Sequence, residues 1–300
     1  MIGEGGMGAV YAGIDRSTRT RVAVKVIQAS SSHQLDALHR FLLEARTAAT
    51  INHPAVVRVV HVDVSDDGLL YQVQELVDGD TLQKRLRLGK RWEPSTVARF
   101  VSVLCEALAA AHAQGIVHRD VKPSNVMLTK TAPGLRLLDF GIAKLYEDVS
   151  GQNEATQAGV ILGTPAFMAP EQIDGRNVTD RADVYAVGVI VFLLLTGRYP
   201  FDEGTPRAMI MSHVLVPAPD ARTLEPTVPE DLAALVARCL AKDPIARPSA
   251  AELAKTLATF ADARGAQTLD AMEQGSALCD VEVPAAEAAR TAVARKRPVA

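Results

Sequence analysis

The sequence predicts an α+β chain in which short strands and one helix come first and a mainly helical part follows. Two apolar segments of strand length, residues 9–14 and 22–27, lie in the first 75 residues. Beyond that point, long apolar segments follow helical spacing, among them residues 93–114 and 229–240. Since 48% of the 300 residues are hydrophobic, the chain can bury a large core. We expect one domain over residues 1–262 and a flexible tail over residues 263–300.

Each element follows from a local pattern. Leucine and alanine recur at roughly helical spacing over residues 33–50, and residues 135–138 form a short apolar strand. The helix over residues 93–114 has Pro94 near its start, where the missing N–H of proline does no harm. The apolar run 184–195 is too short to span a bilayer, so we expect a buried central helix that ends at Thr196-Gly197. A further helix is predicted over residues 249–260. The tail is rich in alanine, lacks aromatic residues and ends with basic residues, which favours a flexible segment.

Charge and cysteine content limit the class of partner and the compartment. The net charge is −3, so we expect neither a nucleic-acid partner nor binding to a membrane surface. Cys105, Cys239 and Cys279 lack the spacing of a metal site or a disulfide framework, as is typical of a reducing cytosol. The N-terminus leads directly into a glycine-rich segment, so no signal peptide is predicted. We expect a cytoplasmic protein without a membrane span in this chain, attached to a membrane only if the full gene product extends past residue 300.

The segment His118-Arg119-Asp120-Val121-Lys122-Pro123-Ser124-Asn125 is the most informative in the chain. It places the parts of a phosphoryl-transfer site within eight residues. Asp120 can accept the proton of an attacking hydroxyl, Lys122 can lie against the transferred phosphate, and Asn125 offers an amide oxygen to Mg²⁺. The alternative is a solvated loop with ordinary charges, and the other motifs of the chain argue against it.

A glycine-rich segment opens the chain, with Gly3, Gly5 and Gly8 in the pattern G-x-G-x-x-G. Glycine has no Cβ, so such a backbone can close over phosphates and present its N–H groups to them. The pattern alone is weak evidence for a phosphate site, because a plain glycine-rich turn can have the same sequence pattern. The strand-like residues that follow argue against a dinucleotide-binding βαβ unit, in which a helix follows at once.

Three further residues complete the predicted site. Lys25 lies in an apolar strand, where a lysine is costly unless it is paired, and its expected partners are nucleotide phosphates and Glu44. Glu44 lies in the middle of the helix predicted over residues 33–50, and a solvated helix face is its alternative setting. Asp139, in Asp139-Phe140-Gly141, follows the strand over residues 135–138 and supplies a second metal ligand beside Asn125.

In this order, the motifs resemble those of the eukaryotic-like serine/threonine protein kinases, most closely the bacterial branch with a G-E-G-G-M-G loop. The resemblance covers roughly residues 1–260. It implies a two-lobed protein-kinase fold, with an N-lobe over residues 1–75 that has a small antiparallel sheet and one helix, and a larger, mainly helical C-lobe over residues 76–262. It also implies ATP as the phosphoryl donor, Mg²⁺ as cofactor, protein substrates with Ser or Thr, and a homodimer as one arrangement for autophosphorylation.

The resemblance assigns roles residue by residue. Gly3, Gly5 and Gly8 cover the phosphates, Lys25 contacts them and pairs with Glu44, and Asp120 is the catalytic base. Lys122 neutralises the γ-phosphate, Thr164 bridges Asp120 and Lys122, and Asn125 and Asp139 hold Mg²⁺. The adenine ring is expected between Val10, Ala23 and Met127, against the backbone of the hinge Glu75-Leu76-Val77. Glu171 is expected to pair with Arg247, and Asp183 to anchor the catalytic loop. For Thr164, a solvated hydroxyl in a loop is the alternative.

The segment from Asp139 to Glu171 carries a regulatory prediction. In this family, an arginine at the position of Arg119 pairs with a phosphate on the activation segment, and Thr156 is the best candidate to carry that phosphate. We therefore predict that phosphorylated Thr156 meets Arg119 and orders the segment.

Two other functions fit parts of the sequence. A pseudokinase or scaffold would bind nucleotide or partner proteins without phosphate transfer, but such proteins usually lack an equivalent of Lys25, Asp120 or Asp139. A small-molecule kinase on the same fold would generally lack the peptide-binding elements Gly163-Thr164 and Ala169-Pro170-Glu171. Both alternatives rank behind an active serine/threonine kinase.

Overall fold

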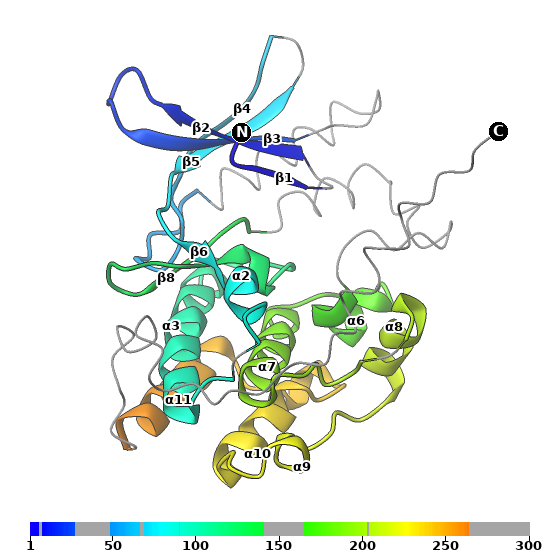
Figure 1. Ribbon diagram of the computed structural model, residues 1–300. Helices are drawn as coiled ribbons and strands as arrows, with labels where there is room; N and C mark the ends of the chain where they lie inside the picture. The colour runs from blue at the N-terminus through cyan, green and yellow to red at the C-terminus, as the bar shows by residue number, and fades with distance from the viewer. Residues whose placement is uncertain are drawn as a thin grey trace, which may run out of the picture.

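The computed structural model in Figure 1 has two lobes, one built on a sheet and one built on helices. It describes residues 1–5, 8–27, 49–66, 69–89, 91–140, 165–202 and 204–263. The first lobe contains β1 (Gly3–Gly5), β2 (Gly8–Ile14), β3 (Arg21–Ile27), β4 (Val59–Val64) and β5 (Leu70–Glu75). Three short strands at the junction of the lobes are β6 (Asp80–Thr81), β7 (Val126–Leu128) and β8 (Leu135–Leu137). The helices of the second lobe are α2 (Leu82–Leu86), α3 (Pro94–His112), α6 (Pro170–Ile173), α7 (Arg181–Thr196), α8 (Pro206–Leu215), α9 (Ala221–Leu224), α10 (Glu230–Cys239) and α11 (Ala250–Ala263).

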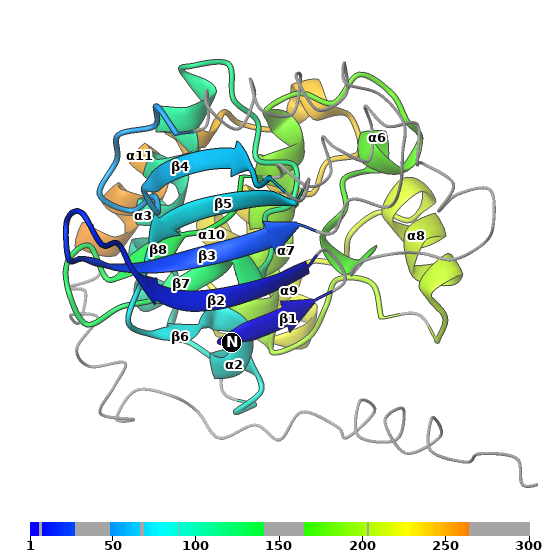
Figure 2. The same ribbon diagram turned by 90° about the horizontal axis from the view of Figure 1, so that it is seen from above.

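The sheet of the first lobe is antiparallel throughout and has the strand order β1-β2-β3-β5-β4. Figure 2 shows these strands side by side from above. Gly5 of β1 lies opposite Gly8 of β2, so the glycine-rich segment contributes to two paired strands. Strand β1 has only three residues, and a bond from the Ile2 N–H to the Val10 carbonyl (2.8 Å) extends its pairing. The predicted helix over residues 33–50 falls almost entirely outside the described residues.

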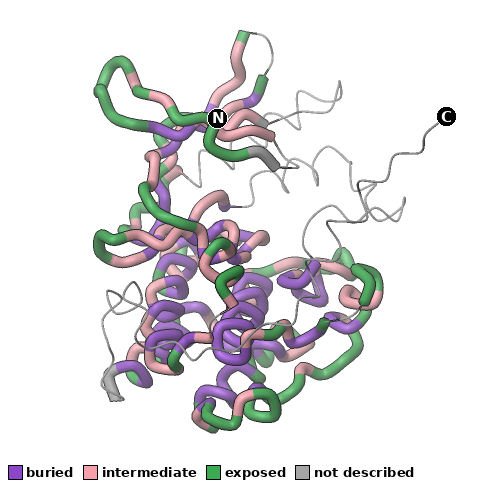
Figure 3. Tube along the Cα trace, viewed as in Figure 1, coloured by how far each residue is buried: buried purple, intermediate pink, exposed green. Residues whose placement is uncertain are grey.

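The core of the helical lobe is organised around α7. Every residue from Ala182 to Thr196 is buried. Other elements surround this helix on all sides, which is why its sequence is almost uniformly apolar. The helix ends at Gly197, whose φ of 71° is the left-handed conformation that glycine adopts without strain. Helices α3 and α10 pack against it, and α11 packs against the side of α3. Figure 3 shows the buried stretches concentrated in the helices of this lobe.

The four helices predicted in the second lobe are confirmed, with ends shifted by one to three residues. They are α3, α7, α10 and α11. Helices α2, α6, α8 and α9, which have ten residues or fewer, were not predicted from the sequence. Among the described residues, one helix has the length and apolar character that a membrane span needs; it is α3, and most of it is buried within the fold.

A small three-stranded sheet, β6-β7-β8, joins the lobes. The predicted strand over residues 135–138 is confirmed as β8, which pairs with β7. The segment 55–57 runs along the other side of β8, because the Leu137 N–H donates to the Ala55 carbonyl (2.7 Å) and the Val57 N–H to the Leu137 carbonyl (2.9 Å). Strand β7 follows Asn125 directly and β8 ends two residues before Asp139. The small sheet therefore brings two predicted metal ligands to the same edge.

Candidate active site

The loop over residues 118–125 holds two predicted catalytic residues and one predicted metal ligand against one another. Lys122 Nζ lies 2.7 Å from Asp120 Oδ2. Asn125 Nδ2 donates to the Asp120 carbonyl oxygen (2.8 Å) and to Asp120 Oδ2 (3.1 Å). The side chains of Asp120 and Lys122 are 17% and 22% exposed. The Asp120 carboxylate is thus fixed in direction and still reachable by a substrate hydroxyl.

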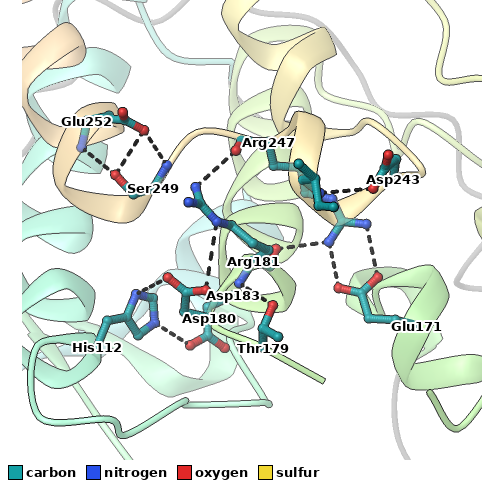
Figure 4. Close-up of polar contacts among 11 residues, drawn as sticks. His112, Glu171, Thr179, Asp180, Arg181, Asp183, Asp243, Arg247, Ser249 and Glu252 are labelled. Carbon is teal, nitrogen blue, oxygen red and sulfur yellow. Dashed lines mark hydrogen bonds and ion pairs between the residues drawn. The ribbon is translucent and has the colours of Figure 1, made fainter. Parts of the chain in front are cut away.

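The buried carboxylate of Asp183 anchors this loop, as the resemblance implies. Asp183 Oδ2 accepts from the His118 N–H (2.8 Å), and Asp183 Oδ1 accepts from the Arg119 N–H (2.8 Å). His112 Nε2 on α3 lies 2.8 Å from Asp183 Oδ2, a contact that Figure 4 shows. Asp183 is 1% exposed and lies in the first turn of α7, where the helix dipole favours a negative charge. It therefore connects α3, α7 and the catalytic loop. The contact with His112 was not predicted from the sequence.

Lys25 pairs with Asp139 rather than standing alone in its strand. Lys25 Nζ and Asp139 Oδ2 are 2.8 Å apart, and the two side chains are 15% and 25% exposed. The pair joins β3 of one lobe to the residues that follow β8 of the other. It removes the cost of an unpaired, largely buried ammonium group. The expected second partner, Glu44, lies outside the described residues.

The residues predicted to hold Mg²⁺ suit a hard, oxygen-seeking cation. Asp139 Oδ1 is buried and has no hydrogen-bond donor among the described residues, so this oxygen lacks the partner that a buried carboxylate needs. The amide nitrogen of Asn125 is engaged by Asp120, which leaves the amide oxygen as the group that can face a cation. One carboxylate, one amide oxygen and phosphate oxygens form a ligand set that Mg²⁺ accepts.

The positions predicted for nucleotide binding come from both lobes. In the N-lobe, Val10 on β2 lies directly opposite Lys25 on β3, and Ala23 on β3 is buried. In the other lobe, Met127 is half-buried on β7, opposite Thr81 of β6. The predicted hinge begins at Glu75, the last residue of β5, and leads to β6. The contacts of these residues with adenine stay a prediction.

The predicted pair of Glu171 and Arg247 is confirmed. Arg247 Nη1 lies 2.6 Å from Glu171 Oε1, and Arg247 Nη2 donates to Glu171 Oε2 at 2.9 Å. Figure 4 shows this bidentate contact between α6 and the loop before α11. The side chains are 0% and 4% exposed, so the pair is shielded from water. It fixes α6, the helix next in sequence to the segment over residues 141–164.

A second buried polar cluster lies near this pair, and no pattern in the sequence pointed to it. Tyr185 Oη and His213 Nδ1 are 2.9 Å apart, while Lys242 Nζ donates to the His213 carbonyl (2.7 Å) and lies 4.4 Å from the Phe201 ring centre. Burial, and then the charge of Lys242, lowers the pKa of His213 to about 4. Burial also lowers the pKa of Lys242 to about 8.

Sequence reasoning also missed Gln172, which follows Glu171 on α6. Its amide connects α6 to the carbonyl of Arg119 (2.8 Å), next to the predicted catalytic base. A glutamine beside a recognised motif gives no sequence signal of such a contact. Thr164 and Thr156, by contrast, were predicted, but both lie outside the described residues.

Comparison with known proteins gives the family. The family model described as "Protein kinase domain" matches residues 1–257. The serine/threonine-protein kinase Pkn1 of Myxococcus xanthus is 43% identical over 246 residues, which are 81% of this chain and 35% of Pkn1. The serine/threonine-protein kinase pkn2 of the same organism is 42% identical over 273 residues, which are 89% of this chain and 32% of that protein.

A solved structure matches the fold as well. The kinase domain of Mycobacterium tuberculosis PknI superposes with a TM-score of 0.68 at 28% identity, covering 86% of this chain and 93% of that one. The chain belongs to the protein kinase family, and it is a bacterial, eukaryotic-like serine/threonine protein kinase domain. It spans about a third of the length of the two Myxococcus relatives.

Proposed function

We propose that this chain transfers the γ-phosphoryl group of ATP to Ser and Thr hydroxyl groups of proteins, its own activation segment included. The observation that carries the proposal is the arrangement of Asp120, Lys122 and Asn125. A carboxylate, an ammonium group and an amide are held within hydrogen-bond distance of one another in a loop whose side chains are partly exposed. Phosphoryl transfer asks little covalent chemistry of a protein, so fixed position and charge are the main requirements.

Each residue then has a definite task. Asp120 orients the substrate hydroxyl and receives its proton, and Lys122 offsets negative charge on the moving phosphoryl group. Lys25 holds the phosphates of ATP from the N-lobe side, beneath Gly3, Gly5 and Gly8. Asn125 and Asp139 would hold Mg²⁺, which supplies charge neutralisation at the phosphate oxygens when bound.

The proposal extends to compartment and regulation. ATP is the donor, and Cys105 and Cys239 are buried free thiols, so we propose that the domain works in the reducing cytoplasm. We also propose that Thr156 receives a phosphate, which a second copy of the chain can supply in a transient homodimer. Once present, this phosphate meets Arg119 and orders the activation segment.

The test is the intact mass of the chain after incubation with ATP and Mg²⁺, beside an Asp120→Asn variant. We expect phosphate to be added to the wild type and not to the variant, because the amide cannot take the proton of the hydroxyl. Mapping the added phosphate to Thr156 would support the regulatory part. ATP binding without phosphate transfer to the chain itself or to an added acceptor protein such as casein would contradict the proposal and identify a nucleotide-binding scaffold instead.

A further inference from the structure

We infer that Gln172 is a positioning residue that holds the backbone of Arg119 and, through it, the direction of Asp120. The inference rests on the proposed function, because it assigns Gln172 a part in placing the catalytic base. It concerns a residue of α6 that touches neither the predicted phosphate site nor the predicted metal ligands.

The side-chain amide of Gln172 is used at both ends. Gln172 Nε2 donates to the Arg119 carbonyl at 2.8 Å, and Gln172 Oε1 accepts from the Ala169 N–H at 3.1 Å. A flipped amide would set oxygen against the carbonyl and nitrogen against the N–H, so only one orientation satisfies both contacts. One end caps α6, and the other reaches the catalytic loop.

The backbone that Gln172 reaches is in an unfavourable conformation. Arg119 has a φ of 61°, in the left-handed region that residues with a Cβ rarely adopt. Such a conformation persists only where its surroundings enforce it. Here the Arg119 N–H is held by Asp183 of α7 and the Arg119 carbonyl by Gln172 of α6. Two different helices thus hold the two sides of one strained residue.

The carbonyl that Gln172 binds belongs to the peptide unit that leads into Asp120. Because a peptide unit is planar, the orientation of the Arg119 carbonyl also fixes the positions of the Asp120 nitrogen and Cα. It thereby sets the direction in which the Asp120 side chain points. The opposite side of Asp120 is held by Asn125, whose amide donates to the Asp120 carbonyl. The Asp120 N–H, in the same peptide unit as the Arg119 carbonyl, donates to His118 Nδ1 at 3.3 Å. Gln172 therefore holds the carbonyl end of the peptide unit that enters Asp120, on the side of Asp120 that Asn125 does not reach.

The support behind Gln172 is rigid. Its neighbour Glu171 is locked to Arg247 by two bonds in a buried site, so the backbone of α6 cannot easily shift. A change at Gln172 is consequently expected at the catalytic loop rather than in α6 as a whole.

Two substitutions separate the two ends of the amide. Gln172→Glu keeps an oxygen for the Ala169 N–H and removes the donor to the Arg119 carbonyl, whereas Gln172→Met removes both. Gln114→Glu is the matched control, because Gln114 also donates to a backbone carbonyl, that of Ala110 at 3.4 Å, but at the exposed end of α3. The measurements are kcat for phosphate transfer to casein, the Kd of a fluorescent ATP analogue, the thermal midpoint, and hydrogen exchange of the backbone amides of residues 119–121.

We expect both Gln172 variants to lose about tenfold or more in kcat, since a small misplacement of a catalytic group has effects of this size or larger. The Kd of the analogue should stay at the wild-type value in both variants, and exchange of the loop amides should become faster in both. The thermal midpoint should stay at the wild-type value in Gln172→Glu, whereas Gln172→Met, which also loses the cap of α6, should show a small decrease. The control should match the wild type in every measurement.

Three results would overturn the inference. If Gln172→Glu behaves as wild type and only Gln172→Met is impaired, the residue merely caps α6. If both variants keep the wild-type kcat and exchange rates, it has no effect on the loop. If nucleotide binding and the thermal midpoint fall together with kcat, its role is in general folding. If the wild type itself transfers no phosphate, the proposed function fails, and the exchange rates still decide whether Gln172 holds the loop.

Discussion

Arg247 satisfies an unusual number of partners for a single residue. Besides its two bonds to Glu171, its guanidinium lies 4.8 Å from the centre of the Tyr185 ring. It also donates to three backbone carbonyls, those of Arg181, Ala241 and Lys242. A planar group with five N–H donors can satisfy such a set, and a lysine cannot. The residue thereby connects α6, α7 and the loop before α11.

Removing Arg247 should be costly. We expect Arg247→Ala to lower the free energy of unfolding by about 3–5 kcal/mol, because Glu171 would remain as a buried charge without its partner. Denaturant unfolding measures the change. Arg21→Ala is the control, since Arg21 and Asp78 form an exposed pair with side chains 65% and 81% exposed, and its effect should stay below about 1 kcal/mol. Equal effects of the two substitutions would contradict this account of the buried pair.

At the scale of elements, the junction between the lobes depends on close backbone contact. Gly79 precedes β6, and a Cβ at this position would overlap the carbonyl oxygen of Leu128 on β7 and come within 3.7 Å of the Met127 side chain. Only glycine lets β6 lie against β7 in this way. Since β7 carries Met127, this contact also sets one wall of the predicted adenine site.

Gly79→Ala should therefore weaken nucleotide binding. The added methyl group forces β6 away from β7, at a cost of about 1–3 kcal/mol, and we expect the Kd of a fluorescent ATP analogue to rise about tenfold. Gly204→Ala is the control, because a Cβ there meets open space. An unchanged Kd in the Gly79 variant would mean that the junction adapts without cost.

At the scale of the whole molecule, buried polar groups link stability to pH. His213 is 1% exposed, and its pKa is lowered from 6.5 to about 4 by burial and by Lys242. Between these two values the unfolded chain binds a proton that the folded chain does not. Stability therefore rises with pH across this window and is lost as the pH falls from 6.5 toward 4.

The His213 contribution can be isolated by comparison with His213→Leu. From pH 7 to pH 4 we expect the wild type to lose about 3 kcal/mol more unfolding free energy than the variant, because the variant has no group to protonate at this site. Denaturant unfolding at several pH values gives the slope of the unfolding free energy against pH for each protein. The contribution of the carboxylates that the two proteins share cancels in the difference between the two slopes. Parallel slopes would contradict the assignment.

The sequence by itself determined the family and the long helices, and it predicted the residues of the site. These rest on local patterns: fixed residue types at short spacing around Asp120 and Asp139, and helical periodicity in α3, α10 and α11. The resemblance added two long-range contacts, Glu171 with Arg247 and Asp183 with the catalytic loop, and both are confirmed. The shortest helices escaped prediction because a single turn carries too little periodicity to be recognised.

Only the tertiary structure decided which partners the buried polar groups take. Lys25 meets Asp139 across 114 residues of sequence, and Gln172 reaches Arg119 across 53. Tyr185 and His213 come together on two helices of the C-lobe. Sequence periodicity reports the neighbours within one turn or one strand, whereas these pairs exist because the packing of distant elements removes the groups from water and requires each to find a partner.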